Sequence, residues 1–285
     1  MRWRRFREED AESIRRFLLP RETRCPAAVG RFLELNAARD RIWFASDRDS
    51  DPVRAFVFLG GGGALLPVLD ADALSTGERE RAVGALRRLL RFRRVHSVQA
   101  PKDDAILAEE ALAALGHAEG ERIDYALMAL DGRPDEAALR AGPAALVVRR
   151  AGPNDADALF PLQASYEREE VVPRGAELNR AACRLALERT LACRLVLLAE
   201  LDGQVVAKAN TNARAFERDQ VGGVYVVPEK RGLGIAQKLV AELVAVLSAE
   251  GRAASLFVKK RNEAAIAAYR RVGFRAGGEY RITYY

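Results

Sequence analysis

Apolar residues along the C-terminal half follow two periods, one typical of strands and the other typical of helices. Asp202-Gly203 is the strongest short hairpin signal, because it separates strand-like runs at 195–201 and 204–212. Pro228 is expected to end the next strand and Gly273 to end the last helix. In chain order this half predicts a strand at 146–149, helices from 154 and over 179–192, the hairpin, a strand at 221–227, a helix at 236–250, a strand at 255–258, a helix at 262–272 and one or two strands over 274–285.

The N-terminal half repeats this order of elements with different residues. It predicts a strand at 2–6, helices from 9 and over 26–38, a hairpin of strands at 42–45 and 53–59, a strand at 65–69, a helix at 77–91, a strand at 96–99 and a helix at 105–115. The helix endings correspond, because Leu115-Gly116-His117 stands where Val272-Gly273-Phe274 stands. We therefore expect a duplicated α/β fold, with domains at 1–130 and 144–285 and a linker at 131–143 that is rich in proline, glycine and alanine.

Composition excludes several classes of protein. With 285 residues and 49% apolar content, the chain can form two domains of about 140 residues each. It contains no apolar run as long as a membrane span and no signal-peptide core, so we expect a cytoplasmic protein without a membrane partner. The three cysteines have neither disulfide pairing nor metal-ligand spacing, so we expect no metal. The 46 basic residues are interspersed with 40 acidic ones, which favours a solvated surface over a nucleic-acid partner.

A glycine-containing loop, Arg231-Gly232-Leu233-Gly234-Ile235-Ala236, lies between a predicted strand and a predicted helix. Its glycines allow successive backbone N–H groups to converge, and the helix N-terminus adds a partial positive charge, so the loop predicts a diphosphate ligand. A dinucleotide fingerprint would need a small residue in place of Gln237 and an acid in place of Lys259-Lys260. A mononucleotide P-loop would need Gly-Lys-Ser/Thr, which this loop does not supply.

The remaining pattern, R-x-x-G-x-A, resembles the pyrophosphate loop of the GCN5-related N-acetyltransferase (GNAT) superfamily. The segment from Asn262 to Tyr269, followed by Gly273-Phe274, resembles the second motif of that superfamily at the expected place. The resemblance covers the C-terminal half closely and the N-terminal half only in its order of elements. It implies two tandem GNAT-like domains, each a mixed, mostly antiparallel twisted sheet flanked by helices.

The resemblance also implies acetyl-CoA as co-substrate and assigns residues to it. The backbone of Val224, Tyr225 and Val226 would bind the pantetheine arm, and Asn262 would contact the same region. Arg231, Gly232, Leu233, Gly234, Ile235, Ala236 and Gln237 would hold the pyrophosphate. Tyr269 would protonate the leaving CoA thiolate. From the helix alone, Asn262 can equally be a helix N-cap and Tyr269 a core aromatic.

Family members commonly place a glutamate on the fourth or fifth strand, and this chain departs from that pattern, because neither 222–227 nor 256–258 contains an acid. We take Glu169 and Glu170, in the segment that commonly borders the acceptor, as candidate general bases, although a solvated helix end explains them as well. Tyr166, Asn210 and Asn212 are candidates for the acceptor pocket. The two asparagines alternate with Lys208 on one face of a strand, where polar groups need hydrogen-bond partners unless the strand ends at a wet edge.

The N-terminal half lacks these motifs. Ala105 and Leu112 occupy the positions of Asn262 and Tyr269, and acids surround the start of its crossover helix. The run of glycines at 60–63 lies between two strands, which favours a turn over a phosphate site. We expect a degenerate copy and one cofactor site per chain.

The leading hypothesis is therefore an acetyl-CoA-dependent N-acetyltransferase for a small-molecule or amino-acid-like amine, acting by direct attack as a monomer or homodimer. A protein or peptide acetyltransferase and a non-catalytic acyl-CoA sensor are the alternatives. The acceptor itself is not encoded in the cofactor motif.

Overall fold

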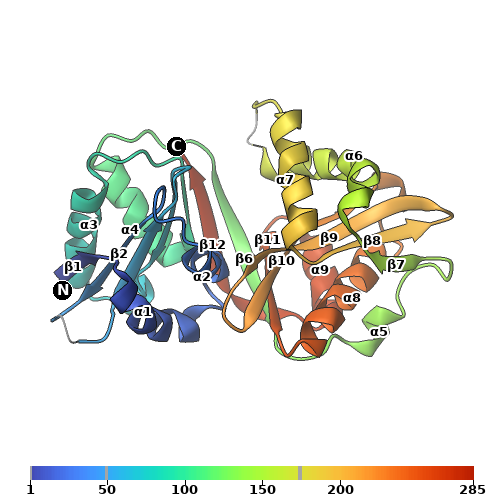
Figure 1. Cartoon of the computed structure of the whole chain (residues 1–285), viewed down its shortest axis with the longest axis horizontal. Coiled ribbons are helices and arrows are strands. Elements are labelled where there is room, and N and C mark those ends of the chain that lie inside the picture. The colour runs from blue at the N-terminus through green and yellow to red at the C-terminus, as the bar shows by residue number, and fades with distance from the viewer. Residues whose placement is uncertain (1, 49–50, 173–174) are drawn as a thin grey trace. The chain divides into compact units, whose positions relative to one another are not determined.

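The structure, a computed structural model, describes residues 2–48, 51–172 and 175–285 (Figure 1). The chain divides into an N-terminal unit, Met1–Leu127 with Gly277–Tyr285, and a C-terminal unit, Met128–Ala276. Both units contain a mixed sheet flanked by helices, so the predicted α/β class is confirmed. None of the helices in the described ranges is long and apolar enough to cross a bilayer.

The N-terminal unit has a sheet with the strand order β1-β2-β3-β4-β5-β12-β6. Its strands are β1 (Arg2–Arg5), β2 (Arg41–Ser46), β3 (Ala55–Leu59), β4 (Ala64–Val68), β5 (Ser97–Pro101) and most of β6 (Arg122–Leu130) and β12 (Arg275–Tyr284). Its helices are α1 (Ala11–Leu18), α2 (Pro26–Leu33), α3 (Thr76–Leu90) and α4 (Lys102–Ala113), with short 3-10 turns η1 (Glu8–Asp10), η2 (Leu19–Arg21) and η3 (Ala71–Ala73). β4 and β5 pair in parallel through the crossover helix α3, and the other pairs from β1 to β12 are antiparallel.

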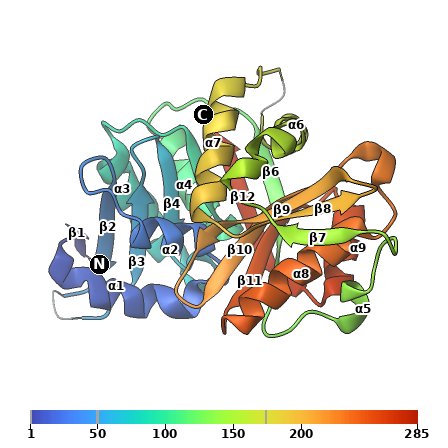
Figure 2. The same cartoon turned by 45° about the vertical axis from the view of Figure 1, so that its right-hand side comes forward.

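The C-terminal unit has the strand order β6-β11-β10-β9-β8-β7. Its strands are β7 (Val147–Arg150), β8 (Val196–Leu201), β9 (Gln204–Arg214), β10 (Arg218–Val226) and β11 (Ala253–Lys259). Its helices are α5 (Glu136–Leu139), α6 (Ala156–Tyr166), the π-helical turn η5 (Glu167–Val171), α7 (Arg180–Cys193), α8 (Ile235–Ala249) and α9 (Glu263–Val272), with 3-10 turns η4 (Pro153–Asp155) and η6 (Pro228–Lys230). In both views α6 and α7 lie on one face of this sheet and α8 and α9 on the other (Figure 2).

Local sequence explains why this unit folds as predicted. Asp202 and Gly203 both adopt positive φ, 52° and 76°, which is the backbone of the tight hairpin turn between β8 and β9. Gly273, at φ 111°, ends α9 in the left-handed conformation. Helix α8 buries seven of its side chains, as expected for a crossover helix that packs on a parallel pair: Ile235, Leu239, Val240, Ala241, Leu243, Val244 and Leu247.

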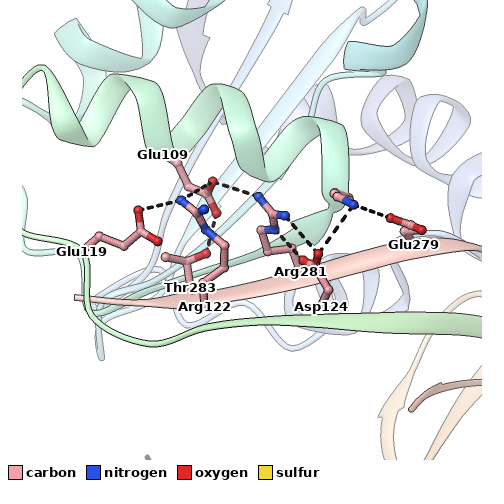
Figure 3. A network of polar contacts seen from close by, with 8 residues as sticks. Glu109, Glu119, Arg122, Asp124, Glu279, Arg281 and Thr283 are labelled. Carbon is pink, nitrogen blue, oxygen red and sulfur yellow. Dashed lines mark hydrogen bonds and ion pairs between the residues drawn. The ribbon is translucent and has the colours of Figure 1, made fainter. Parts of the chain in front are cut away.

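The last strand of the chain departs from the expected organisation, in which 274–285 completes the second domain. Residues 277–285 belong to the N-terminal unit, where β12 pairs antiparallel with β5. Tyr280 is 1% exposed, and Arg281 donates to the Asp124 carboxylate at 2.6 Å and to Glu109 at 3.3 Å (Figure 3). Thr283 also donates to Glu109. The strand is held there by burial and by ion pairs that its alternating pattern does not reveal.

Two further segments differ from the sequence expectations. The segment 131–143, expected as a linker, belongs to the C-terminal unit, where Arg218 donates to Asp131 at 2.6 Å and Asp135 N donates to Val272 O at 2.9 Å. Strand β6 lies just before it and was not predicted. Helix α2 ends at Leu33 rather than at 38, because Asn36 and Asp40 form a local turn of side-chain to backbone bonds.

Candidate active site

Strands β10 and β11 separate part-way along their length. Their parallel pairing ends where Val221 lies opposite Leu256, although β10 continues to Val226 and β11 to Lys259. On the side of β11, the edge of β10 over 222–226 is therefore not paired with a strand. An extended ligand arm can form main-chain hydrogen bonds to such an edge as a strand would.

On its other side β10 carries a β-bulge against β9. The register shifts by one residue between Gly222 and Tyr225, so Gly223 and Val224 together oppose the single residue Ala209. Gly223 has φ 58°, in the left-handed region that favours glycine. Bulges of this kind turn backbone groups out of the ladder and are common beside active sites.

A row of polar side chains on β9, Lys208, Asn210 and Asn212, lies directly against this bulge. Lys208 Nζ donates to Asn210 Oδ1 at 3.1 Å, and Asn210 Nδ2 donates to Asn212 Oδ1 at 2.9 Å. A Cβ on Gly222 would lie 2.1 Å from Asn212 Nδ2, and one on Gly223 would lie 2.0 Å from Asn210 Oδ1. The two glycines of β10 thus make room for the polar row.

Lys208, the one charged residue of the row, is 1% exposed. Its ammonium also donates to Gly223 O at 2.9 Å and lies 5.1 Å from the centre of the Tyr166 ring. Burial lowers the pKa of Lys208 to about 8, against the opposing effect of the Glu167 carboxylate and the Cys183 thiol. A lysine in this setting changes charge near neutral pH.

The glycine loop has the geometry expected of an anion site. Gly232 and Gly234 both have φ 79°, and a Cβ on Gly234 would lie 3.0 Å from Gly142 N. At the start of α8, Lys238 N donates a backbone hydrogen bond to Gly234 O at 3.1 Å. The amides just before Lys238 therefore have no acceptor within the helix. These amides and the helix dipole can bind a diphosphate.

Glu169, on the π-helical turn, connects β10 to this loop. The Tyr225 hydroxyl donates to Glu169 Oε1 at 2.8 Å, and Arg231 Nη2 donates to Oε2 at 2.9 Å. Arg231 Nε also donates to Val226 O at 3.0 Å. Arg231 is therefore held at the start of the glycine loop by its bonds to Glu169 and Val226. Both oxygens of Glu169 already accept hydrogen bonds.

Glu170, also on the π-helical turn, forms an ion pair with Lys259 at 2.9 Å. Burial raises the pKa of Tyr269, and the charges of Tyr166 and Glu170 raise it further. Tyr269 is 9% exposed, and the raised pKa keeps its hydroxyl protonated at neutral pH.

Asn262 is the N-cap of α9, where its Oδ1 accepts from Ala265 N at 3.1 Å. The carbonyl oxygen of its side chain is thereby fixed, and the amide nitrogen is the group left to meet a ligand. Its contact with the pantetheine region stays a prediction. Among the described residues, no group of three or more His, Cys, Asp and Glu side chains is arranged to bind a metal ion.

Comparison with known families decides what this arrangement belongs to. The model of the Acetyltransferase (GNAT) family matches residues 157–274, which include the loop, the bulge and Tyr269. Residues 157–274 are a GNAT acetyltransferase domain. Sequence comparison with the curated proteins gives no match.

Solved structures extend the GNAT likeness to the fold of the whole chain. A Drosophila protein aligns with TM-score 0.67 and 13% identity over 99% of this chain and 98% of that chain. A GCN5-related N-acetyltransferase from Sphaerobacter thermophilus gives 0.58 and 20% over 99% and 94%, and a tandem GNAT protein from the clavulanic acid biosynthesis pathway gives 0.56 and 17% over 99% and 97%. These likenesses concern the fold, and the predicted tandem GNAT-like architecture is confirmed.

Several site features of the GNAT domain could not be found from sequence. The prediction used the backbone of Tyr225, whereas the hydroxyl of this residue contacts Glu169. The Lys259–Glu170 pair joins residues far apart in the chain, and only the fold reveals it. The polar row was visible as alternation of Lys208, Asn210 and Asn212, but its contact with the glycines depends on register.

Proposed function

We propose that the protein transfers an acetyl group from acetyl-CoA to the amine of a small-molecule or amino-acid-like acceptor, at one site in the GNAT domain. The observation that carries the proposal is the coincidence, on one strand, of the separation from β11, the bulge at Gly223 and the glycine loop that follows. An extended arm with a diphosphate at one end and a thioester at the other fits this sequence of features.

In this proposal the chain binds and orients the co-substrate with its backbone. Amides from Gly232 to Gln237 hold the pyrophosphate, assisted by Arg231, and the edge of Val224 to Val226 holds the pantetheine arm. Acetyl-CoA supplies the acetyl thioester. The amide at the bulge donates to the thioester carbonyl and stabilises negative charge as it develops there.

Tyr269 and Glu170 are proposed to move the protons. The acceptor nitrogen forms a bond to the carbonyl carbon, the C–S bond breaks, and the Tyr269 hydroxyl gives its proton to the departing sulfur. The proton lost from the amine passes to Glu170, directly or through water. Glu170 is preferred to Glu169 because both oxygens of Glu169 accept hydrogen bonds, from Tyr225 and Arg231, whereas one oxygen of Glu170 pairs with Lys259 and the charge of Glu170 acts on Tyr269.

A covalent enzyme intermediate has no support in this site. Burial raises the pKa of Cys183, which keeps its thiol in the poorly nucleophilic protonated form. Direct attack by the acceptor, with the reacting groups held close together, is therefore the proposed route. The acceptor pocket is proposed to lie beside Tyr166, Asn210 and Asn212.

The test is thiol release from acetyl-CoA by the full chain in the presence of single amines, amino acids, polyamines and short peptides. We expect thiol release that depends on one class of amine, with an acetylated product confirmed by mass spectrometry. Turnover restricted to peptides would favour a protein acetyltransferase. Tight binding of acetyl-CoA without turnover of any amine would favour a sensor, and the absence of binding would reject the proposal.

A further inference from the structure

The chain contains far more arginine than lysine, but the basic residue that contacts the bulge of β10 is a lysine, Lys208. Only six of the 46 basic residues are lysines. Lys208 is the one that is 1% exposed, at the centre of the sheet of the GNAT domain. A lysine ammonium is a compact charge with rotatable donors, and it fits a small buried site that a planar guanidinium does not.

The contacts of Lys208 identify the group that it holds. Of the backbone atoms around it, the bulge carbonyl Gly223 O accepts from Nζ at 2.9 Å, and Asn210 Oδ1 accepts the second bond at 3.1 Å. A Cβ added to Gly223 would lie 2.9 Å from Nζ. The missing side chain of Gly223 is therefore what lets the ammonium approach the carbonyl.

Fixing this carbonyl also fixes the next amide. The peptide bond between Gly223 and Val224 is planar and trans, so its C=O and N–H point in opposite directions. With the carbonyl directed at Lys208, the Val224 N–H is directed away from the polar row. A charged donor also draws electrons toward the carbonyl oxygen, which makes that N–H a stronger donor.

We propose that Lys208 is a positioning residue, which holds the Gly223 carbonyl so that the Val224 N–H is aimed at the thioester carbonyl of acetyl-CoA. The inference rests on the proposed function, because it needs acetyl-CoA in the gap between β10 and β11. Lys208 itself touches neither the thioester nor the acceptor and acts through the peptide group. Through this peptide group, the strength of the Val224 N–H as a donor depends on the buried charge of Lys208.

The charge on Lys208 makes this device sensitive to pH. The groups that face its ammonium are the Tyr166 ring from α6, Glu167 from the π-helical turn and Cys183 from α7, in addition to Asn210 and Gly223. Burial outweighs the charged neighbours and lowers the pKa of Lys208 to about 8. Above this pH the bond to Gly223 O loses its charge assistance, and the Val224 N–H is held less firmly.

The test uses the carbonyl stretch of acetyl-CoA bound to the full chain, isolated as the infrared difference between complexes of unlabelled and carbonyl-¹³C-labelled acetyl-CoA. A stronger N–H donor lowers this frequency. We expect the band of Lys208→Met to lie at higher frequency than that of wild type, and the band of Lys102→Met, a lysine of the N-terminal unit, to coincide with wild type. Raising the pH from 6.5 to 9.5 should move the wild-type band upward with a midpoint near 8 and leave the Lys208→Met band unmoved.

The outcomes separate this inference from the function on which it rests. If wild type does not bind acetyl-CoA, both fail. If it binds, and the band is the same in wild type and Lys208→Met, the positioning role is wrong while the function stands. If Lys208→Met does not fold, the wild-type titration decides alone, because a band that does not move between pH 6.5 and 9.5 overturns the role.

Discussion

The crossover helices of the two units begin in opposite ways. Helix α8 of the GNAT domain follows Gly232 and Gly234 and has no acid in its first turn. Helix α3 of the N-terminal unit follows Ser75, whose N–H and hydroxyl donate to the Glu78 carboxylate at 3.0 and 2.7 Å. These hydrogen bonds lower the pKa of Glu78 and keep it charged. The negative charge of Glu78 at the start of α3 would therefore repel a diphosphate.

The parallel strands of the two units also separate, with different consequences. In the N-terminal unit the pairing of β4 with β5 ends where Leu65 lies opposite Val98. Just beyond, the Asp104 carboxylate accepts from Leu69 N at 3.0 Å and Ala71 N at 2.8 Å. The amides that would meet a ligand arm at the end of β4 are therefore bonded to a side chain of α4.

A third difference lies at the end of the helix that follows. Phe274 N donates to Tyr269 O at 3.0 Å, and His117 N donates to Leu112 O at 3.1 Å, so Leu112 occupies the place of Tyr269. Leucine offers no proton. The two units share a fold and differ in each group that the proposed reaction needs, which illustrates that function resides in the site rather than in the fold.

The largest effect is expected from placing a bulky acid in the glycine loop. Gly234→Glu puts a side chain where a Cβ would lie 3.0 Å from Gly142 N and adds negative charge at the diphosphate position. We expect affinity for acetyl-CoA to fall by more than about 100-fold, or about 2.7 kcal/mol, in calorimetric titration. The matched control is Gly251→Glu, with φ 70° just beyond the other end of α8 and open space around it, which should bind as wild type does. Equal affinity in both variants would contradict the loop assignment.

Removing one hydroxyl should separate chemistry from binding. Tyr269→Phe is expected to lower turnover by about 100-fold, the usual scale of general-acid catalysis, with acetyl-CoA affinity unchanged. Steady-state thiol release with the best acceptor measures the first quantity and titration the second. Tyr280→Phe, a buried tyrosine of the N-terminal unit, is the control and should keep wild-type turnover. Unchanged turnover in Tyr269→Phe would remove its role as acid.

In the N-terminal unit, Asp104→Asn is expected to affect stability and not binding. An asparagine offers only one acceptor oxygen to two amides, and a donor left facing a donor should lower the free energy of unfolding by about 1–3 kcal/mol. Chemical denaturation measures the loss, and acetyl-CoA titration serves as the control. A variant as stable as wild type would show that the amides of Leu69 and Ala71 do not depend on the Asp104 carboxylate.

The same carboxylate should leave a signature in pH. Burial raises the pKa of Asp104 to about 6, against the two amide bonds and the charge of Arg24, whereas the charge of Asp70 raises it further. An acid whose folded-state pKa lies above its unfolded value contributes stability that is present at low pH and lost as pH rises toward 6. The unfolding free energy of wild type minus that of Asp104→Asn should therefore decrease between about pH 4 and 6. A difference that is constant over this range would contradict the raised pKa.

The smallest expected effect concerns the cap of α3. Ser75→Ala removes the hydroxyl that donates to Glu78 and should destabilise the protein by about 1 kcal/mol, seen as a small decrease in Tm. It should not create a second acetyl-CoA site. Two molecules bound per chain in this variant would show that the cap alone separates the two units.

The sequence predicted most elements of the GNAT domain, because the residues that end its strands and helices act on the backbone locally. Asp202-Gly203, Pro228 and Gly273 each set a backbone conformation without help from distant residues. The loop was predictable for the same reason, since glycines at fixed offsets determine where its amides can point. The duplication was visible because both units repeat these local signals in the same order.

Pairings between distant segments were not predictable. The alternation of the last strand indicates β structure but does not show that Tyr280 to Tyr284 pairs with β5 rather than within the second domain. The contacts of Glu169 with Tyr225 and Arg231 and the placement of Asp104 below the end of β4 likewise depend on how separate elements pack. The proline- and glycine-rich composition of 131–143 indicated a linker, whereas the Arg218–Asp131 ion pair and the backbone bond from Asp135 N to Val272 O fix that segment to the C-terminal unit.

The most direct test of one cofactor site per chain is a crystal structure of the full protein grown with an excess of CoA. We predict one CoA, with its pyrophosphate on the amides of Gly232 to Gln237 and its pantetheine arm along Val224 to Val226. A CoA bound at the loop between Leu69 and Ser75, or one at each unit, would contradict the account.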